Sequence, residues 1–172
     1  GGGVREGQEF GASSPKRLWE RDTDSHGTAV ASHVIGFETG SFFVDGVAPG
    51  AVIIPLKVFP NGEAETFSSR IVAALAYVTE LRQSGRVGPT VVNLSLGGSR
   101  PSLLERRAIG DAISAGLIVV SSAGNRGEAG MDWPAAYPEV ISVGAVGWTG
   151  QFRPGTVDEP NTAFWWTNDV GN

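Results

Sequence analysis

The side chain best suited to chemistry in this sequence is His26, because it stands directly before a predicted helix. The apolar residues behind it recur at helical spacing: Val30, Val34 and Ile35. They predict a helix over about 26–37 with a buried body. Asp24 or Ser25 can cap its first turn, since a short polar side chain accepts an N–H that is free there. An imidazole on such a rigid element suits general acid–base catalysis, and the alternative is a histidine that only caps or packs.

Two further segments, 93–98 and 121–125, combine small polar residues with glycine at the end of an apolar strand. The first ends a strand predicted over 90–96, and the second ends a strand predicted over 117–122. In open parallel sheets, ligands bind beyond the carboxyl ends of the strands. The sequence therefore predicts a binding site formed by these two segments.

The elements that must position these residues alternate between strands and helices. Strands are predicted over 51–59, 90–96, 117–122 and 139–146, and helices over 26–37, 66–83 and 102–116. Pro55 predicts a bulge or an unpaired stretch, because proline cannot donate to a strand ladder. The alternation predicts an α/β fold, a three-layer sandwich with a mostly parallel central sheet flanked by helices. Loops are predicted over 1–21 and 36–45, with no boundary between domains.

Composition excludes several classes of function. The 172 residues are 41% hydrophobic and 18% charged, which fits one globular domain with its own core. The net charge of −5 at pH 7 and the scattered basic residues argue against a nucleic-acid surface. No apolar run approaches the roughly 18 residues of a membrane span. The absence of cysteine excludes disulfides and thiolate metal sites and is compatible with an exported protein.

Four segments, in this order, resemble motifs of the subtilisin-like serine proteases. They are Ser25–Thr28; Gly46–Pro49 followed by Lys57 and Val58; Asn93–Gly98; and Ala123–Asn125 followed by Tyr137-Pro138 and Val143–Ala145. Each motif alone is a weak signal, but four at about the family's separations are a specific one. The likeness covers a core over 25–146, between a loop or linker over 1–24 and a poorly matched tail over 147–172. The resemblance implies a subtilisin-like fold, incomplete at both ends.

The resemblance also implies the activity and its catalytic groups. The family's members are serine endopeptidases that hydrolyse polypeptides through an acyl-enzyme, using an Asp-His-Ser triad. His26 would take the serine proton and then protonate the leaving amine. Asn125 would donate its side-chain amide to the tetrahedral oxyanion.

The substrate-binding residues that the resemblance implies come from the two glycine-containing segments. Ser95, Leu96 and Gly97 would pair with an extended substrate as an added strand. The opposite wall of the main specificity pocket would be formed by Ser122, Ala123 and Gly124. Because both walls are small, the pocket is expected to accept a sizeable side chain.

Two members of the family's triad have no counterpart in the sequence. The aspartate ends an apolar strand well upstream of the histidine, and 1–24 contains no predicted strand of that kind. Asp22 and Asp24 resemble instead the acidic loop that precedes the histidine. The serine lies in a Gly-Thr-Ser-Met-Ala stretch, which does not occur here. Ser95 is an alternative nucleophile, but its context matches the substrate-binding strand. We therefore expect the Asp and Ser segments to lie outside this chain, which by itself would be inactive.

Two other classes of function remain as alternatives. A non-catalytic relative would bind extended polypeptide without cleaving it, although such a binder gains nothing from keeping both His26 and Asn125. A nucleotide-binding sheet would need a phosphate-cradling loop. Neither G-x-x-x-x-G-K-[ST] nor a G-x-G-x-x-G between a strand and a helix is present.

No cofactor is expected for the chemistry. Four loop acids could hold a structural calcium ion, as in many relatives: Glu38, Asp45, Glu63 and Glu65. Their spacing is not specific, so the preferred interpretation is that they are solvated loop acids. His33 is predicted to be a packing residue. From family habit we expect a polypeptide substrate, a monomeric complete protein and a secreted location, and no signal peptide is visible in the sequence.

Overall fold

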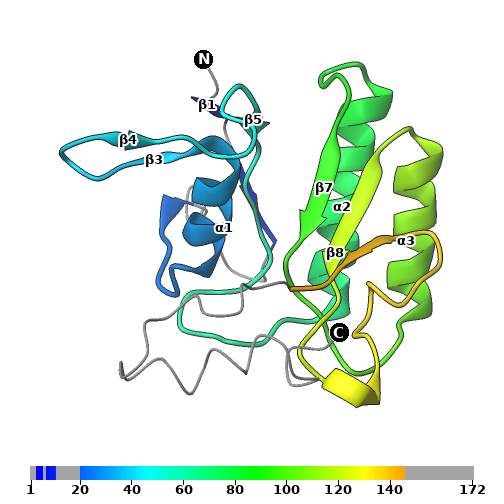
Figure 1. The fold of residues 1–172 in the computed structure, drawn as a ribbon. Coiled ribbons are helices and arrows are strands. Elements are labelled where there is room, and N and C mark those ends of the chain that lie inside the picture. Colours follow the sequence, from blue (N-terminus) through cyan, green and yellow to red (C-terminus); the bar gives the residue numbers. More distant parts are fainter. Residues whose placement is uncertain (1–2, 6, 11–19, 146–172) are drawn as a thin grey trace, which may run out of the picture. The chain divides into compact units, whose positions relative to one another are not determined.

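A computed structural model describes residues 3–5, 7–10 and 20–145 (Figure 1). By its internal contacts the chain divides into two compact units, residues 1–74 and 75–172. The sequence predicted no boundary, because no linker-like change of composition separates the two. The division falls inside the helix α2 (Ser68–Gln83), which runs without interruption from one unit into the next.

Short parallel strand pairs organise the first unit. They are β1 (Gly3–Val4) with β5 (Val52–Ile53), and β2 (Gln8–Glu9) with β6 (Leu56–Lys57). The prediction of a loop or linker over 1–24 is therefore wrong for β1 and β2. Strands of two residues give no periodic signal, and they depend here on partners far along the chain.

Pro55 interrupts the single strand that was predicted over 51–59. The observed strands β5 and β6 lie on either side of Ile54 and Pro55. The Pro55 carbonyl still accepts a hydrogen bond from the Gln8 backbone N–H at 2.9 Å. Proline keeps its acceptor and lacks a donor, so one side of the ladder persists while strand pairing is broken.

A hairpin replaces the loop that was predicted over 36–45. It consists of the antiparallel strands β3 (Phe37–Glu38) and β4 (Phe43–Val44). The backbone N–H and the hydroxyl of Thr39 both donate to the Phe42 carbonyl at 3.0 Å and close the turn. The prediction of a loop missed it because each strand again has only two residues.

Helix α1 (His26–Ile35) confirms the predicted helix and ends two residues earlier. Gly36 ends it with a φ of 94°, a conformation that side chains with a Cβ rarely adopt. None of its residues is fully buried, and Val30 and Val34 are half-buried. The predicted buried body of this helix is therefore wrong for the structure as described.

The second unit contains a three-stranded parallel sheet in the order β7-β8-β9, which confirms the predicted parallel topology (Figure 1). The strands are β7 (Val91–Leu94), β8 (Ile118–Ser122) and β9 (Ile141–Val143). Each lies within a strand predicted from an apolar run bounded by turn residues. Such runs are typical of strands in parallel sheets.

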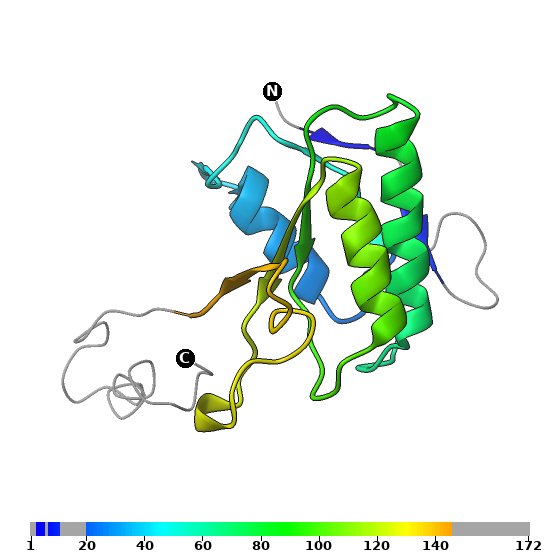
Figure 2. The same cartoon turned by 90° about the vertical axis from the view of Figure 1, so that its right-hand side faces the viewer.

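Two helices, α2 and α3 (Leu103–Ser114), lie side by side against one face of this sheet (Figure 2). The sheet and the helices contribute buried apolar side chains to the core of the unit: Leu75, Val78, Leu81, Val92, Leu94, Ile109, Ala112 and Val119. Full burial of one such aliphatic side chain contributes roughly 1.5–3 kcal/mol. This core holds the carboxyl ends of β7 and β8 in place.

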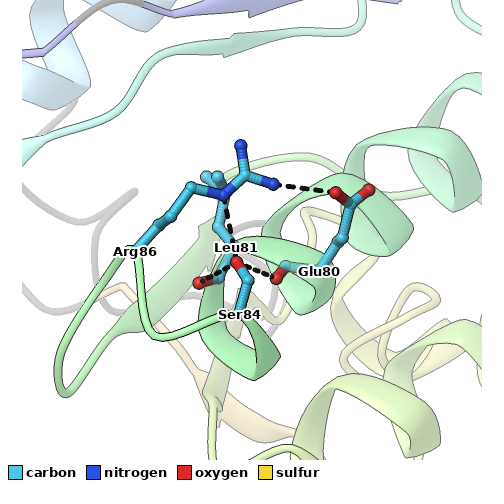
Figure 3. Close-up of polar contacts among 4 residues, drawn as sticks. All are labelled: Glu80, Leu81, Ser84 and Arg86. Atoms are coloured by element: carbon cyan, nitrogen blue, oxygen red, sulfur yellow. Dashed lines mark hydrogen bonds and ion pairs between the residues drawn. The ribbon is translucent and has the colours of Figure 1, made fainter.

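The carboxyl end of α2 is closed as the sequence predicted, with Gly85 just beyond it at a φ of 71°. Figure 3 shows how the next residue folds back on the helix: Arg86 Nη2 donates to Glu80 Oε1 at 2.7 Å, and Nε donates to Ser84 Oγ at 3.0 Å. The Ser84 hydroxyl in turn donates to the backbone carbonyls of Glu80 and Leu81. These contacts satisfy carbonyls that the helix end leaves without intrahelical partners.

The starts of α2 and α3 differ in how well they were predicted. Ser102 Oγ accepts the Glu105 backbone N–H at 3.3 Å, as the capping-box pattern predicted for α3. Thr66 was expected to cap α2, but its hydroxyl donates to the Val58 carbonyl. The helix begins two residues later, at Ser68.

Candidate active site

His26 is the first residue of α1, at the amino end where the sequence placed it. Its predicted caps are wrong, because Ser25 has a left-handed φ of 66° and its side chain makes no capping bond. The cap is Asp22. Its carboxylate accepts backbone N–H groups of Asp24 at 3.1 Å, of Ser25 at 2.7 Å and of Thr28 at 3.1 Å. A single carboxylate thus organises the loop and the first turn around the histidine.

The Asp22 carboxylate is held in its ionised form. The hydroxyl of Thr28 donates to Oδ2 at 2.5 Å, and this bond is the main cause that lowers the pKa of Asp22 from 3.8 to about 2. Partial burial acts in the opposite direction, and the three backbone N–H donors add to the lowering. A negative charge at this position is also favourable toward the positive end of the α1 dipole.

The two histidines of α1 are both exposed. Exposure suits His26 to exchange a proton with a substrate. His33 was predicted to pack, and this prediction is wrong because its ring is exposed, with Nδ1 2.7 Å from the Ala29 carbonyl oxygen. That contact lies within the helix, so His33 contributes to α1 itself and not to a core.

The Gly46–Pro49 segment closes on the carboxyl end of α1. The backbone N–H of Val47 donates to the His33 carbonyl at 3.0 Å, and that of Ala48 donates to the Val34 carbonyl at 2.8 Å. A Cβ on Gly46 would overlap the Val34 carbonyl. The glycine of this motif is therefore required by close backbone approach, and the motif fixes the helix that carries His26.

In the second unit, the two glycine-containing segments meet at the carboxyl ends of β7 and β8, as predicted. Leu94 is paired with Ser121, and the buried Ser121 hydroxyl donates to the Leu94 carbonyl at 3.1 Å. The register therefore brings the predicted substrate-binding residues of the two segments together: Ser95, Leu96 and Gly97 beside Ser122, Ala123 and Gly124. Their roles, and those of His26 and Asn125, stay predictions.

Asn125 follows directly at the end of the second segment, and it is exposed. Gly124 before it has a φ of 93°, so the backbone turns sharply after β8. Ala123 anchors the turn, because its N–H donates to the Val143 carbonyl at 2.9 Å. A strand end fixed on both sides is a rigid support for a side-chain amide that must meet a developing charge.

Sequence reasoning missed a third segment, which joins the other two. Trp133 exchanges two backbone hydrogen bonds with Gly98, at 2.8 and 2.9 Å. The N–H of Asp132 donates to the Ala123 carbonyl at 2.8 Å. Residues 132–133 therefore link the segment after β7 to the segment after β8.

The Asp132 side chain lies against both glycines of the predicted walls. A Cβ on Gly97 would lie 3.0 Å from Asp132 Cβ, and a Cβ on Gly124 would lie 2.7 Å from Asp132 Cγ. Its Oδ1 forms an ion pair with Arg126 Nε at 2.6 Å. The sequence predicted only small neutral residues at this position. The one signal that could have indicated an additional side chain is the glycine in each wall, which leaves space for it.

Within residues 3–5, 7–10 and 20–145, no group of three or more His, Cys, Asp or Glu side chains is arranged to hold a metal ion. In the same part of the chain, no helix has the length and apolar character that crossing a membrane requires.

A parallel sheet flanked by helices, with two linked glycine-containing segments at its strand ends, defines an α/β protein. The chain belongs to the Subtilase family, whose model matches residues 6–167. The resemblance noted in the sequence is thereby confirmed.

Named relatives agree with this assignment. The chain is 34% identical to Subtilisin DY of Bacillus licheniformis over 132 residues, which are 74% of this chain and 45% of that protein. It is 33% identical to Subtilisin Savinase of Lederbergia lenta over 142 residues, 83% of this chain and 49% of that protein. The chain therefore spans about half the length of these curated relatives.

The solved structure of Sphericase confirms the fold. It matches with a TM-score of 0.70 and 28% sequence identity, covering 83% of this chain and 47% of that one. The chain thus has the subtilisin-like α/β fold, with a parallel sheet and flanking helices. Again the match extends over about half of the solved chain.

Proposed function

We propose that this chain is the histidine- and oxyanion-bearing part of a serine endopeptidase that cleaves polypeptides. The observation that carries the proposal is that His26 and Asn125 both stand at element ends that the fold holds rigidly. His26 opens α1 under the Asp22 cap, and Asn125 ends the turn after β8. Membership of the Subtilase family supports the same activity.

The two side chains supply complementary parts of acyl transfer. His26 takes the proton of the serine hydroxyl as it attacks the scissile carbonyl, and then gives that proton to the leaving amine. Asn125 donates its amide N–H to the oxygen that becomes negative in the tetrahedral intermediate. The serine and the aspartate of the triad are provided by segments outside these 172 residues.

The substrate binds as an extended strand beside residues 95–97. Leu94 is the last residue of β7 that pairs with β8, so residues 95–97 lie beyond the ladder, and the extended substrate pairs with their backbone. Residues 122–124 line the opposite side of the bound residue. The chemistry needs no cofactor, and the complete protein acts as an exported monomer.

The experiment begins with the DNA on both sides of this reading frame. An apolar strand ending in aspartate upstream and a Gly-Thr-Ser stretch downstream are expected. The complete protein should then hydrolyse casein and a peptide ester, and a serine-directed phosphonate should abolish both activities. The pure 172-residue chain should have no turnover, because it has no group that forms the acyl-enzyme.

Two results would overturn this proposal. Hydrolysis by the pure 172-residue chain that the phosphonate abolishes would make Ser95 the nucleophile. A complete protein that binds extended peptides with no hydrolysis would assign the chain to the non-catalytic, polypeptide-binding alternative.

A further inference from the structure

We propose that Asp132 makes the site selective for polypeptides with a cationic side chain, lysine or arginine, at the residue held between 95–97 and 122–124. This inference rests on the proposed peptidase function and names the substrate class of that same site. It depends on three properties of Asp132: its fixed position, its incompletely paired carboxylate and its exchangeable partner.

The position of Asp132 is fixed by backbone contacts on both sides. Its N–H donates to the Ala123 carbonyl at 2.8 Å, and its own carbonyl accepts the Ala136 N–H at 2.9 Å. The next residue, Trp133, is paired with Gly98. The side chain also lies against Gly97 of segment 95–97 and against Gly124 of segment 122–124, so it contacts both predicted walls of the specificity pocket. A substrate side chain that enters there meets this carboxylate.

The carboxylate is only partly satisfied. Its Oδ1 atom is buried and, in the part of the chain that the structure describes, accepts no hydrogen bond. Arg126 Nε lies 2.6 Å away, which makes an ion pair without the alignment of a hydrogen bond. A buried charge of this kind favours a cation that can donate along the free direction.

The present partner, Arg126, is exchangeable. The Asp132 side chain is 15% exposed and the Arg126 side chain is 35% exposed. Arg126 precedes the short η2 helix (Gly127–Ala129), and its Nη2 donates to the Met131 carbonyl at 2.8 Å. A substrate cation can take the place of its guanidinium while Arg126 turns into solvent.

The other classes of substrate side chain are disfavoured. A large apolar side chain would cover the Asp132–Arg126 pair and remove water from it without replacing either partner. An acidic side chain would be repelled by the negative charge of Asp132, the less exposed member of the pair. Only a cation gains an interaction with the fixed carboxylate.

The test uses the complete protein and fluorogenic tetrapeptide amides that differ only in the residue before the scissile bond: arginine, lysine, leucine or glutamate. We expect kcat/KM to be about tenfold or more higher for arginine and lysine than for leucine, with glutamate lowest. Asp132→Asn should lower kcat/KM for the arginine substrate to the value for the leucine substrate. Arg126→Gln should keep or increase the preference for arginine, because it frees the carboxylate.

Glu139→Gln is the matched control. It removes a more exposed carboxylate, which also pairs with an arginine, Arg106 on α3, at 2.8 Å, and it should leave the selectivity unchanged. Preference for leucine or glutamate in the unmodified protein, or ratios unchanged in both Asp132→Asn and Arg126→Gln, would overturn the inference.

A failure of the proposed function itself gives a different result. If none of the amides is hydrolysed, calorimetric affinities for the matching tetrapeptide acids decide the inference, because binding needs no nucleophile. Tighter binding of the arginine peptide that is lost in Asp132→Asn supports it. Equal affinities, or no binding, overturn it.

Discussion

Asp22 and Thr28 close the first turn of α1 through two hydrogen bonds to one carboxylate oxygen, from the Thr28 N–H at 3.1 Å and from its hydroxyl at 2.5 Å. The acid lies outside the helix, and five residues separate it from Thr28: three in the loop (23–25) and two in the helix (26–27). His26 lies between the two partners in sequence. The helix turn that carries the candidate base therefore depends on a loop aspartate.

Asp22→Ala should destabilise the protein by about 1 kcal/mol, since it leaves N–H groups at the start of α1 without an acceptor. The free energy of unfolding in urea measures this. Asp24→Ala is the matched control, because the Asp24 side chain makes none of the capping bonds, and its effect should be smaller. An equal loss in both variants would mean that Asp22 does not act as the cap.

The stabilisation by Asp22 should depend on pH. The pKa of Asp22 is about 2 in the folded chain and 3.8 without its partners, so the folded state binds the proton less readily. The contribution is therefore fully present above the unfolded pKa and is lost as the pH falls through the folded one. The difference in unfolding free energy between the wild type and Asp22→Ala should shrink from about pH 6 to about pH 2. A constant difference would contradict the assigned hydrogen bonds.

Much of the fold was predictable where local signals are strong. The strands β7, β8 and β9 are apolar runs bounded by turn residues, and α2 and α3 have apolar faces with a glycine just past the end of each. The strands β1 to β4 were missed because two residues give no periodicity, and pairing with a distant segment decides their state.

The residues of the candidate site likewise differ in how far local sequence signals predict them. His26, Asn125 and the two glycine-containing segments could be found, because each stands next to a predictable element. Asp132 could not, because it reaches the site through its own backbone bond to Ala123 and the backbone bonds of its neighbour Trp133 to Gly98. Only the folded chain places that carboxylate against Gly97 and Gly124.

Gly124→Ala should be more destabilising than Gly130→Ala. Both glycines have a similar positive φ, 93° and 89°, so alanine costs roughly 1–2 kcal/mol at either position. Only at Gly124 does a Cβ also meet Asp132, whereas the space at Gly130 is open. The additional loss should be about 1–3 kcal/mol, as for an overpacked core. Equal midpoints of urea unfolding for the two variants would mean that Asp132 does not lie against Gly124.

Tyr137→Phe should weaken the attachment of α3. The buried Tyr137 hydroxyl donates to the Ser102 carbonyl at 2.8 Å and accepts the Ser102 N–H at 2.9 Å. Its loss leaves two backbone groups without this partner, at a cost of about 1–3 kcal/mol in unfolding free energy. Ser102→Ala is the control, because it keeps both backbone contacts and removes only the cap of Glu105. A stability of Tyr137→Phe equal to that of the wild type would contradict this attachment.

Asn125→Ala in the complete protein should lower kcat and leave KM nearly unchanged, because the amide meets the substrate oxygen fully only when negative charge develops on it. The expected loss is about 10²–10³-fold, a magnitude taken from a subtilisin's own oxyanion asparagine. His26→Ala should remove activity almost entirely, and Asn61→Ala, at an exposed loop asparagine, should leave the kinetics unchanged. Steady-state hydrolysis of one peptide amide by the three variants distinguishes the roles. A large rise in KM for Asn125→Ala with kcat preserved would make this residue a ground-state binding group, and the oxyanion would need another donor.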